Sequence, residues 1–201
     1  MITFPDISEW YTPERIAAEE PLWASGPYKE NAQRVVNVCQ QYSLSSVIEA
    51  GCGTGWVPTA LPDSIVYVGM DSNPYMLSRA RDKNPSRIFI RNDIRDLNPD
   101  FLSVDLVCSF AVLKHFSLNE WPDILRHILG IGQYGLFTQH VLLDDRPAME
   151  VGTEFHHIWP TKPELLQAID SAGHEVLDLD YSAMDHGIGS PEAYVTTRRK
   201  S

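Results

Sequence analysis

A glycine-rich turn directly after an apolar run is the strongest chemical signal in the sequence. Residues 47–55 read Val-Ile-Glu-Ala-Gly-Cys-Gly-Thr-Gly, so a buried strand leads straight into a turn with glycines at positions 51, 53 and 55. Glycine lets the backbone turn tightly and lets a ligand approach where a β-carbon would collide. The segment predicts a loop that holds a nucleotide-type cofactor, with a purely structural tight turn as the alternative.

Polar side chains follow three further apolar runs, at the point where each run ends. The second run ends in Asp71, whose carboxylate can accept hydrogen bonds from both hydroxyls of a ribose or can cap the helix that follows. The third ends in Asn92-Asp93-Ile94 and the fourth in Ser109-Phe110-Ala111-Val112. Because the carboxyl ends of parallel strands meet at one edge of a sheet, these residues predict a single site.

Alternating strands and helices must position these strand ends. We expect strands within residues 45–50, 64–71, 86–93, 104–112 and 134–143, and helices within 73–84, 118–130 and 161–173, with Asn73, Asn119 and Thr161 as caps. Residues 174–182 and 192–200 predict a closing antiparallel pair, and residues 12–20 and 28–42 predict two N-terminal helices. This order indicates a three-layer α/β fold with a mostly parallel sheet.

Size and charge narrow the function classes. The chain has 201 residues, 43% of them hydrophobic, which fits one domain over residues 1–201 with a helical cover at 1–44. Its formal net charge is −11, so nucleic acid is a poor partner, and no apolar run is long enough to cross a bilayer. We expect a cytoplasmic protein whose cysteines Cys39, Cys52 and Cys108 remain thiols. The oligomeric state is left open.

The sequence resembles the class I S-adenosylmethionine-dependent methyltransferases over roughly residues 45–200. The resemblance is carried by Glu-Ala-Gly-Cys-Gly-Thr-Gly, Gly-Met-Asp-Ser-Asn-Pro-Tyr-Met-Leu, Asn-Asp-Ile and Asp-Leu-Val-Cys-Ser-Phe-Ala-Val-Leu-Lys-His-Phe. It implies a Rossmann-like, seven-stranded sheet of order 3-2-1-4-5-7-6 with the last strand antiparallel. It also implies S-adenosyl-L-methionine as cofactor and S-adenosyl-L-homocysteine as product.

The resemblance implies roles for individual residues. Those expected at the methionine part of the cofactor are Glu49, Gly51, Cys52, Gly53, Gly55, Phe110 and Ala111. Those expected at the ribose and adenine are Asp71, Ser72, Asn73, Met76, Asp93 and Ile94. Independently of the resemblance, the N-terminal cover is rich in aromatic residues that can pack on the sheet, and of these we expect Tyr28 to close over the cofactor as a lid.

The segment after the glycine turn departs from the family pattern. Residues 56–61 contain Pro58 and are followed by Pro62, so we expect only a short helix there. We interpret Trp56 as a residue that packs on the sheet. A nicotinamide-dependent oxidoreductase is an alternative, but position 56 is not the glycine that its fingerprint requires, and the chain lacks room for a second domain.

Histidines and aromatic residues near the ends of the fourth and fifth strands are candidates for the acceptor site. A sulfonium methyl is already a strong electrophile, so alignment of the acceptor can suffice, and a base is needed only where the acceptor carries a proton. His115 is the candidate general base, or else it closes its loop by hydrogen bonding.

The acceptor itself is expected to be a small, neutral or cationic molecule that carries a ring. The residues expected to contact it are His140, Phe155, His156, His157 and Trp159. We expect no required metal. The alternative to an enzyme is a catalytically inactive regulatory protein that binds the same cofactor.

Overall fold

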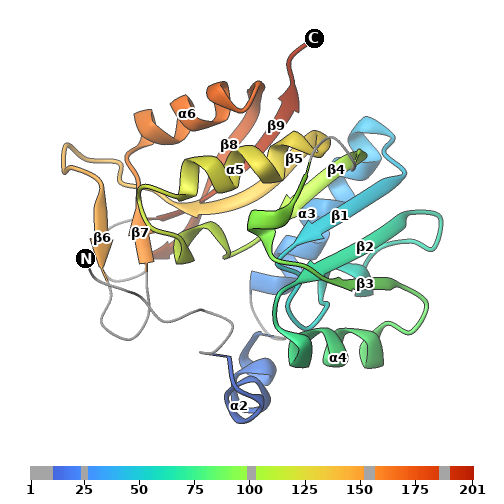
Figure 1. Cartoon of the computed structure of the whole chain (residues 1–201). Coiled ribbons are helices and arrows are strands. Elements are labelled where there is room, and N and C mark those ends of the chain that lie inside the picture. The colour runs from blue at the N-terminus through green and yellow to red at the C-terminus, as the bar shows by residue number, and fades with distance from the viewer. Residues whose placement is uncertain (1–10, 24–26, 99–102, 152–156, 186–190) are drawn as a thin grey trace.

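Seven strands form one twisted sheet in the order β3-β2-β1-β4-β5-β9-β8 (Figure 1). The computed structural model describes residues 11–23, 27–98, 103–151, 157–185 and 191–201. The strands are β1 (Ser46–Ala50), β2 (Val66–Asp71), β3 (Ile88–Arg91), β4 (Val104–Ser109), β5 (Gly132–His140), β8 (His174–Asp185) and β9 (Pro191–Arg199). Strands β1 to β5 pair in parallel, and β9 runs antiparallel to both β5 and β8. The predicted order 3-2-1-4-5-7-6 is therefore confirmed.

Five α-helices accompany the sheet in the described parts of the chain: α2 (Pro13–Trp23), α3 (Pro27–Tyr42), α4 (Pro74–Lys83), α5 (Trp121–Gly130) and α6 (Lys162–Ser171). Asn73 caps α4 by accepting the N–H groups of Tyr75 and Met76, and Thr161 begins α6 with a reciprocal capping box. The prediction that Asn119 caps α5 is wrong. Glu120 occupies that position, and its side chain makes no capping bond there.

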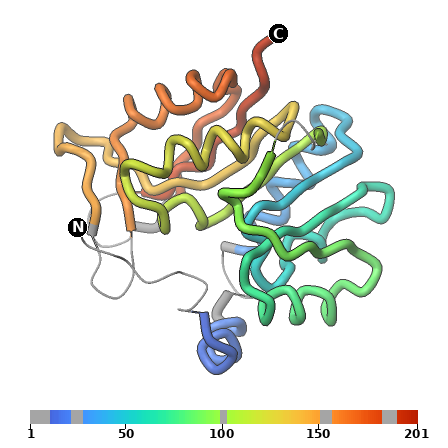
Figure 2. The backbone as a smooth tube through the Cα atoms, viewed as in Figure 1, coloured from blue at the N-terminus to red at the C-terminus, as the bar shows by residue number. Residues whose placement is uncertain are grey.

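Successive apolar side chains along each strand point to opposite faces of the sheet, and both faces are buried. Ile48 of β1 and Val107 of β4 face a core that also contains α5 and α6. Their neighbours Val47 and Leu106 face a second core with α3 and α4, as the period of two along a strand requires. Figure 2 shows that the first part of the chain, blue to green, builds the β1 to β4 side, while β5, β8 and β9 build the other.

Two segments differ from the sequence expectation. The expected helix at residues 56–61 is a single 3-10 turn, η1 (Val57–Thr59), because the prolines at positions 58 and 62 leave too few N–H donors for an α-helix. The connection between β5 and α6 carries an unexpected two-stranded antiparallel sheet of β6 (Met149–Val151) and β7 (His157–Trp159). Across the residues described, no helix is both long and apolar enough to span a membrane.

Candidate functional site

A cavity of about 340 Å³ opens at the carboxyl ends of the central strands. It brings together most of the residues that the sequence placed at a cofactor. Those that line it are Tyr28, Glu49, Gly51, Cys52, Gly53, Asp71, Ser72, Asn73, Met76, Asp93, Ile94, Phe110 and Ala111. Their convergence from β1, β2, β3 and β4 follows from the parallel pairing of these strands.

The glycines of the turn have positive φ angles, and a β-carbon on some of them would collide with neighbouring atoms. Gly51 has φ +78°, and a β-carbon there would lie 2.3 Å from Cγ2 of Val112. Gly53 has φ +50°, and within 4 Å its β-carbon would meet only the sulfur of Met76, at 3.6 Å. Gly51 thus permits close packing of the chain, whereas Gly53 exposes backbone to the cavity.

Gly55 serves the fold rather than the cavity, which corrects its predicted place beside the cofactor. A β-carbon on Gly55 would lie 2.9 Å from the β-carbon of Ala80 in α4. Its carbonyl oxygen accepts a hydrogen bond from Nδ2 of Asn84 at 2.8 Å. Gly55 is therefore required for the close approach of α4 to the loop.

Asp71 holds the glycine turn and the start of α4 together. Its Oδ2 accepts the N–H of Gly53 at 2.9 Å, and its Oδ1 accepts the N–H of Asn73 at 2.9 Å. Burial raises the pKa of this carboxyl group, and the backbone donors oppose the rise. Each oxygen retains acceptor capacity on the side of the cavity, so the carboxylate can bind two hydroxyl groups as well.

Glu49 is a buried acid at the floor of the cavity. The hydroxyl group of Tyr67 donates to its Oε2 at 2.5 Å. Burial raises the pKa of Glu49 to about 8, and the nearby charge of Asp71 adds to the rise. Glu49 is therefore largely protonated at neutral pH until a cation approaches it.

The fourth strand ends in a backbone conformation that is unusual for its residue. Ala111 has φ +57°, and its N–H donates to Oγ1 of Thr138 on β5 at 2.8 Å. Non-glycine residues adopt this conformation at a cost that the surrounding structure must offset. The bend turns the chain from β4 into η3 (Leu113–His115) and sets Phe110 and Ala111 against the cavity.

A group of rings extends from the cavity toward the small sheet. His115 lines the cavity, and its ring centroid lies 5.6 Å from that of His157 on β7. The His157 ring in turn lies 5.9 Å from His140 and 5.6 Å from Trp159. His140 is only 1% exposed. This corrects its predicted contact with the acceptor, because its ring is buried on β5 behind His157.

The remaining acceptor-site predictions have different outcomes. Phe155 and His156 lie outside the described residues. His157 lies beside His115, and Trp159 lies beside His157, although neither lines the cavity itself. In the portions of the chain that are described, no group of three or more His, Cys, Asp or Glu side chains is arranged to hold a metal ion.

Several cavity residues were not found from the sequence. Trp56 lines the cavity, and the ammonium group of Lys83 lies 3.7 Å from the centroid of its ring. The interpretation that Trp56 packs on the sheet stays a prediction. The others include Asn31, Lys114 and Glu192. Lys114 precedes His115 in the sequence and could have been suspected, whereas Glu192 joins the site only through the pairing of β9 with β5.

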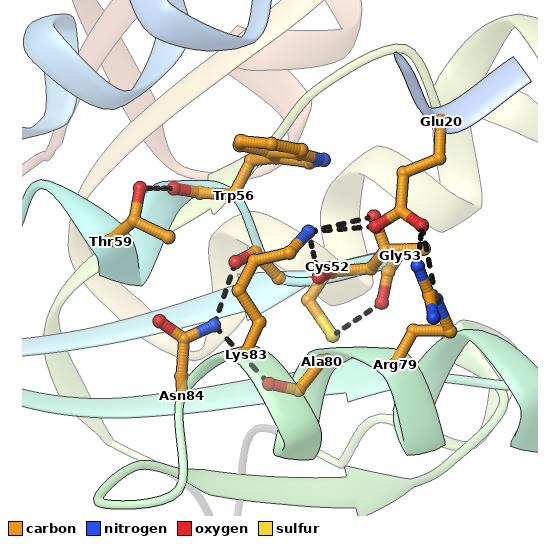
Figure 3. Close-up of polar contacts among 11 residues, drawn as sticks. Glu20, Cys52, Gly53, Trp56, Thr59, Arg79, Ala80, Lys83 and Asn84 are labelled. Atoms are coloured by element: carbon orange, nitrogen blue, oxygen red, sulfur yellow. Dashed lines mark hydrogen bonds and ion pairs between the residues drawn. The ribbon is translucent and has the colours of Figure 1, made fainter. Parts of the chain in front are cut away.

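An ion-pair cluster attaches helix α2 to the rim of the cavity (Figure 3). Glu20 of α2, with a side chain only 8% exposed, binds Arg79 at 2.5 Å and Lys83 at 2.9 Å, both from α4. Lys83 also donates to the carbonyl oxygen of Thr54 in the glycine turn at 3.0 Å. One carboxylate thereby couples α2, α4 and the turn.

Comparison with known proteins agrees with this geometry. Residues 47–131 match the family model of the methyltransferase domain. The chain is 27% identical over 108 residues to trans-aconitate 2-methyltransferase from Escherichia coli O1:K1 / APEC, a match that covers 51% of this chain. It covers 42% of that relative, so the matched part spans less than half of the relative's length.

Solved structures with the same fold cover nearly the whole chain. Magnesium protoporphyrin IX methyltransferase from Synechocystis PCC 6803, with bound S-adenosylhomocysteine, has a TM-score of 0.75 at 13% identity and covers 96% of this chain and 98% of its own. The 1,6-didemethyltoxoflavin-N1-methyltransferase of Burkholderia thailandensis has a TM-score of 0.68 at 17% identity, over 100% and 94% of the two chains. Residues 47–131, from the glycine turn through β4 to the end of α5, thus match a methyltransferase domain, and the chain has the Rossmann-like fold of these methyltransferases along its length.

Proposed function

We propose that the protein transfers a methyl group from S-adenosylmethionine to a small molecule, with the cofactor bound in the 340 Å³ cavity. The observation that carries the proposal is the position of Asp71. Its carboxylate is fixed by the glycine turn and by the start of α4, and it borders the cavity at the end of β2. A carboxylate held in this way is suited to bind both hydroxyl groups of a ribose.

The residues around Asp71 fit the other parts of the cofactor. Asp93 and Ile94 border the cavity at the end of β3, on the side where an adenine ring would follow the ribose. Toward β1 the cavity offers buried polar atoms: Oδ1 of Asn31 and Nε1 of Trp56 have no hydrogen-bond partner among the described residues. The unsatisfied acceptor, Oδ1 of Asn31, suits the amino group of an amino acid, and the unsatisfied donor, Nε1 of Trp56, suits its carboxylate.

Glu49 is suited to bind the amino group of the cofactor. A cation next to Glu49 favours its ionised form and lowers its raised pKa toward the ordinary range. Binding should therefore be accompanied by loss of the proton that burial holds on Glu49. Tyr67 keeps the carboxyl group oriented through its hydroxyl.

The chain's own contribution to the reaction is alignment and proton removal. S-adenosylmethionine, when bound, supplies an electrophilic methyl group on a sulfonium. The buried rings of Phe110 and Phe116 exclude water from the cavity, and His115 lies next to them at its wall. We propose that Nδ1 or Nε2 of His115 takes the proton of the acceptor as general base, with His157 beside it to hold its orientation.

Methyl transfer from radiolabelled cofactor to metabolite extracts tests this proposal. We expect label to move to an extractable small molecule only when the wild-type protein is present, and Asp71→Ala to abolish it. Tight cofactor binding with no transfer to any metabolite fraction would contradict the enzyme function and favour a regulatory protein that binds the cofactor.

A further inference from the structure

Two opposite charges lie in the half of the cavity that the cofactor does not need. Lys114 on η3 and Glu192 at the start of β9 both line the cavity. Glu192 pairs in the sheet with His140 of β5, so this half lies at the β4-β5-β9 edge. Asp71 and Asp93 occupy the ends of β2 and β3, on the other side of β1. The acceptor must therefore lie near Lys114 and Glu192.

Neither charge is satisfied within the described parts of the chain. No hydrogen bond or ion pair joins the ammonium group of Lys114, or the carboxylate of Glu192, to a described residue. Glu192 is 8% exposed, and burial lowers the pKa of Lys114 while the Glu192 carboxylate opposes that change. A charged group at a cavity wall needs water or a polar ligand as its partner, so a cavity lined by two such groups is suited to a polar ligand.

Lys114 and Glu192 do not form an ion pair with each other in the described parts of the chain. A direct ion pair would neutralise both and would leave an apolar wall, but no ion pair within 4.0 Å links them. Each group is available to a ligand that lies between them. An ammonium group donates only, and a carboxylate accepts only, so the matching ligand carries an acceptor next to a donor.

We propose that the methyl acceptor is an acid, with a carboxylate or a comparably acidic oxygen bound by Lys114 and a neighbouring hydroxyl group bound by Glu192. This inference rests on the proposed methyltransferase function and specifies its substrate class. It replaces the neutral or cationic acceptor expected from the net charge of −11, because one cation inside a cavity selects ligands more strongly than the distant surface charges do.

The anion at Lys114 has two possible sources, the acceptor and the carboxylate of the cofactor itself. We assign the anion to the acceptor because Lys114 interacts electrostatically with Glu192 of β9. The amino-acid part of the cofactor is instead expected between Glu49 and the glycine turn, at the end of β1. Binding of S-adenosylhomocysteine separates the two sources, since it contains the cofactor carboxylate and no acceptor.

The test combines Lys114→Met with a metabolite extract split by anion exchange at neutral pH. Wild-type protein and tritiated S-adenosylmethionine should label a compound from the retained, anionic fraction. Lys114→Met should lower kcat/KM for that compound by about tenfold or more, mainly through KM, because a charge-assisted hydrogen bond is lost. Lys114→Arg should restore part of it, and Lys29→Met on the exposed face of α3 should have no effect.

Affinity for S-adenosylhomocysteine should change by less than about twofold in Lys114→Met, and its melting temperature should show that it folds. Label that enters only the unretained, neutral or cationic fraction would overturn the acidic acceptor, and so would an unchanged KM. A tenfold loss of S-adenosylhomocysteine affinity would assign Lys114 to the cofactor instead. Absence of label from both fractions would contradict the proposed function itself, and the inference with it.

Discussion

The ammonium group of Lys83 lies 2.9 Å from Oε1 of Glu20, which fixes helix α2 against helix α4 beside the glycine turn. Tyr11, two residues before the start of α2, adds a second attachment: its carbonyl oxygen accepts a hydrogen bond from Nδ2 of Asn73 at 2.9 Å, and Tyr11 lines the cavity. The N-terminal segment is thus joined at two points to the elements that border the proposed cofactor. Cofactor affinity should depend on this attachment.

Glu20→Gln should weaken the attachment of α2 to α4. The variant keeps the shape of the side chain but removes the charge that Arg79 and Lys83 share, leaving Lys83 half-buried beside a neutral amide. We expect a loss of about 1–2 kcal/mol of stability and a severalfold weaker affinity for S-adenosylhomocysteine. Glu14→Gln, an exposed residue of the same helix, is the matched control for both measurements. Equal affinity in Glu20→Gln and Glu14→Gln would show that the attachment does not matter for binding.

Asp71→Asn should reduce cofactor affinity by about 1–3 kcal/mol, because charge-assisted hydrogen bonds to the ribose become neutral ones. The amide keeps one acceptor oxygen, for the N–H of either Gly53 or Asn73, so the turn should be affected less than in Asp71→Ala, which keeps neither bond. Calorimetric titration with S-adenosylhomocysteine measures the change. Asp82→Asn, exposed on α4, is the control. Unaltered affinity in Asp71→Asn would place the ribose elsewhere.

His115→Ala should lower turnover by about 10²-fold or more while cofactor affinity stays nearly constant, because a general base acts in the reaction and not in cofactor binding. In the wild type, activity should fall as pH decreases and His115 becomes protonated, and the variant should lose this acidic limb. Turnover measured against pH for both proteins gives the answer. A variant with weaker cofactor binding and an intact acidic limb would mean that His115 only orders its loop.

The buried acid Glu49 predicts a pH dependence of stability. Burial raises its pKa from an ordinary 4.5 to about 8, so the folded state binds the proton more tightly than the unfolded state. Its contribution is complete below about pH 4.5 and is lost as pH rises to about 8. The melting temperature of the ligand-free protein should therefore decline over this range, and Glu49→Gln should flatten the decline.

His174 changes the stability of the folded protein in the opposite direction to Glu49, and it does so at lower pH. It therefore sets the lower limit of the pH range in which the effect of Glu49 can be measured alone. Burial lowers its pKa from 6.5 to about 4, so its contribution is present above about pH 6.5 and is lost as pH falls to about 4. Its two ring nitrogens lie 3.1 Å from Oγ1 of Thr197 and 3.1 Å from the carbonyl oxygen of Leu129. A comparison of wild type with Glu49→Gln between about pH 6.5 and 8 isolates Glu49. Parallel melting curves for the two proteins in that window would show that Glu49 is ionised throughout.

The sequence was sufficient to predict the sheet and the cofactor half of the cavity because both depend on local signals. Strand ends such as Asp71 and Asp93 follow apolar runs directly, and the glycine turn is contiguous with β1. Gly55 shows the limit of such signals. The same residue type that admits a ligand at Gly53 admits a neighbouring helix at Gly55, and only the position of Ala80 separates the two uses.

The acceptor half could not be predicted because it is assembled from distant segments. Glu192 enters the cavity only through the register of β9 on β5, far along the sequence from Lys114. His140 illustrates the converse error. Its position near the end of β5 favoured a place at the site, but both faces of β5 are buried from Gly135 to His140, and His140 is only 1% exposed.

Calorimetric titration of the purified protein with S-adenosylhomocysteine, and in parallel with nicotinamide adenine dinucleotide, tests the central claim most directly. Binding to the folded state alone also raises the melting temperature, which gives an independent readout. The account predicts saturable binding of one S-adenosylhomocysteine per chain, competition by S-adenosylmethionine, and no binding of the dinucleotide. Binding of the dinucleotide, with neither S-adenosylmethionine nor S-adenosylhomocysteine bound, would contradict it.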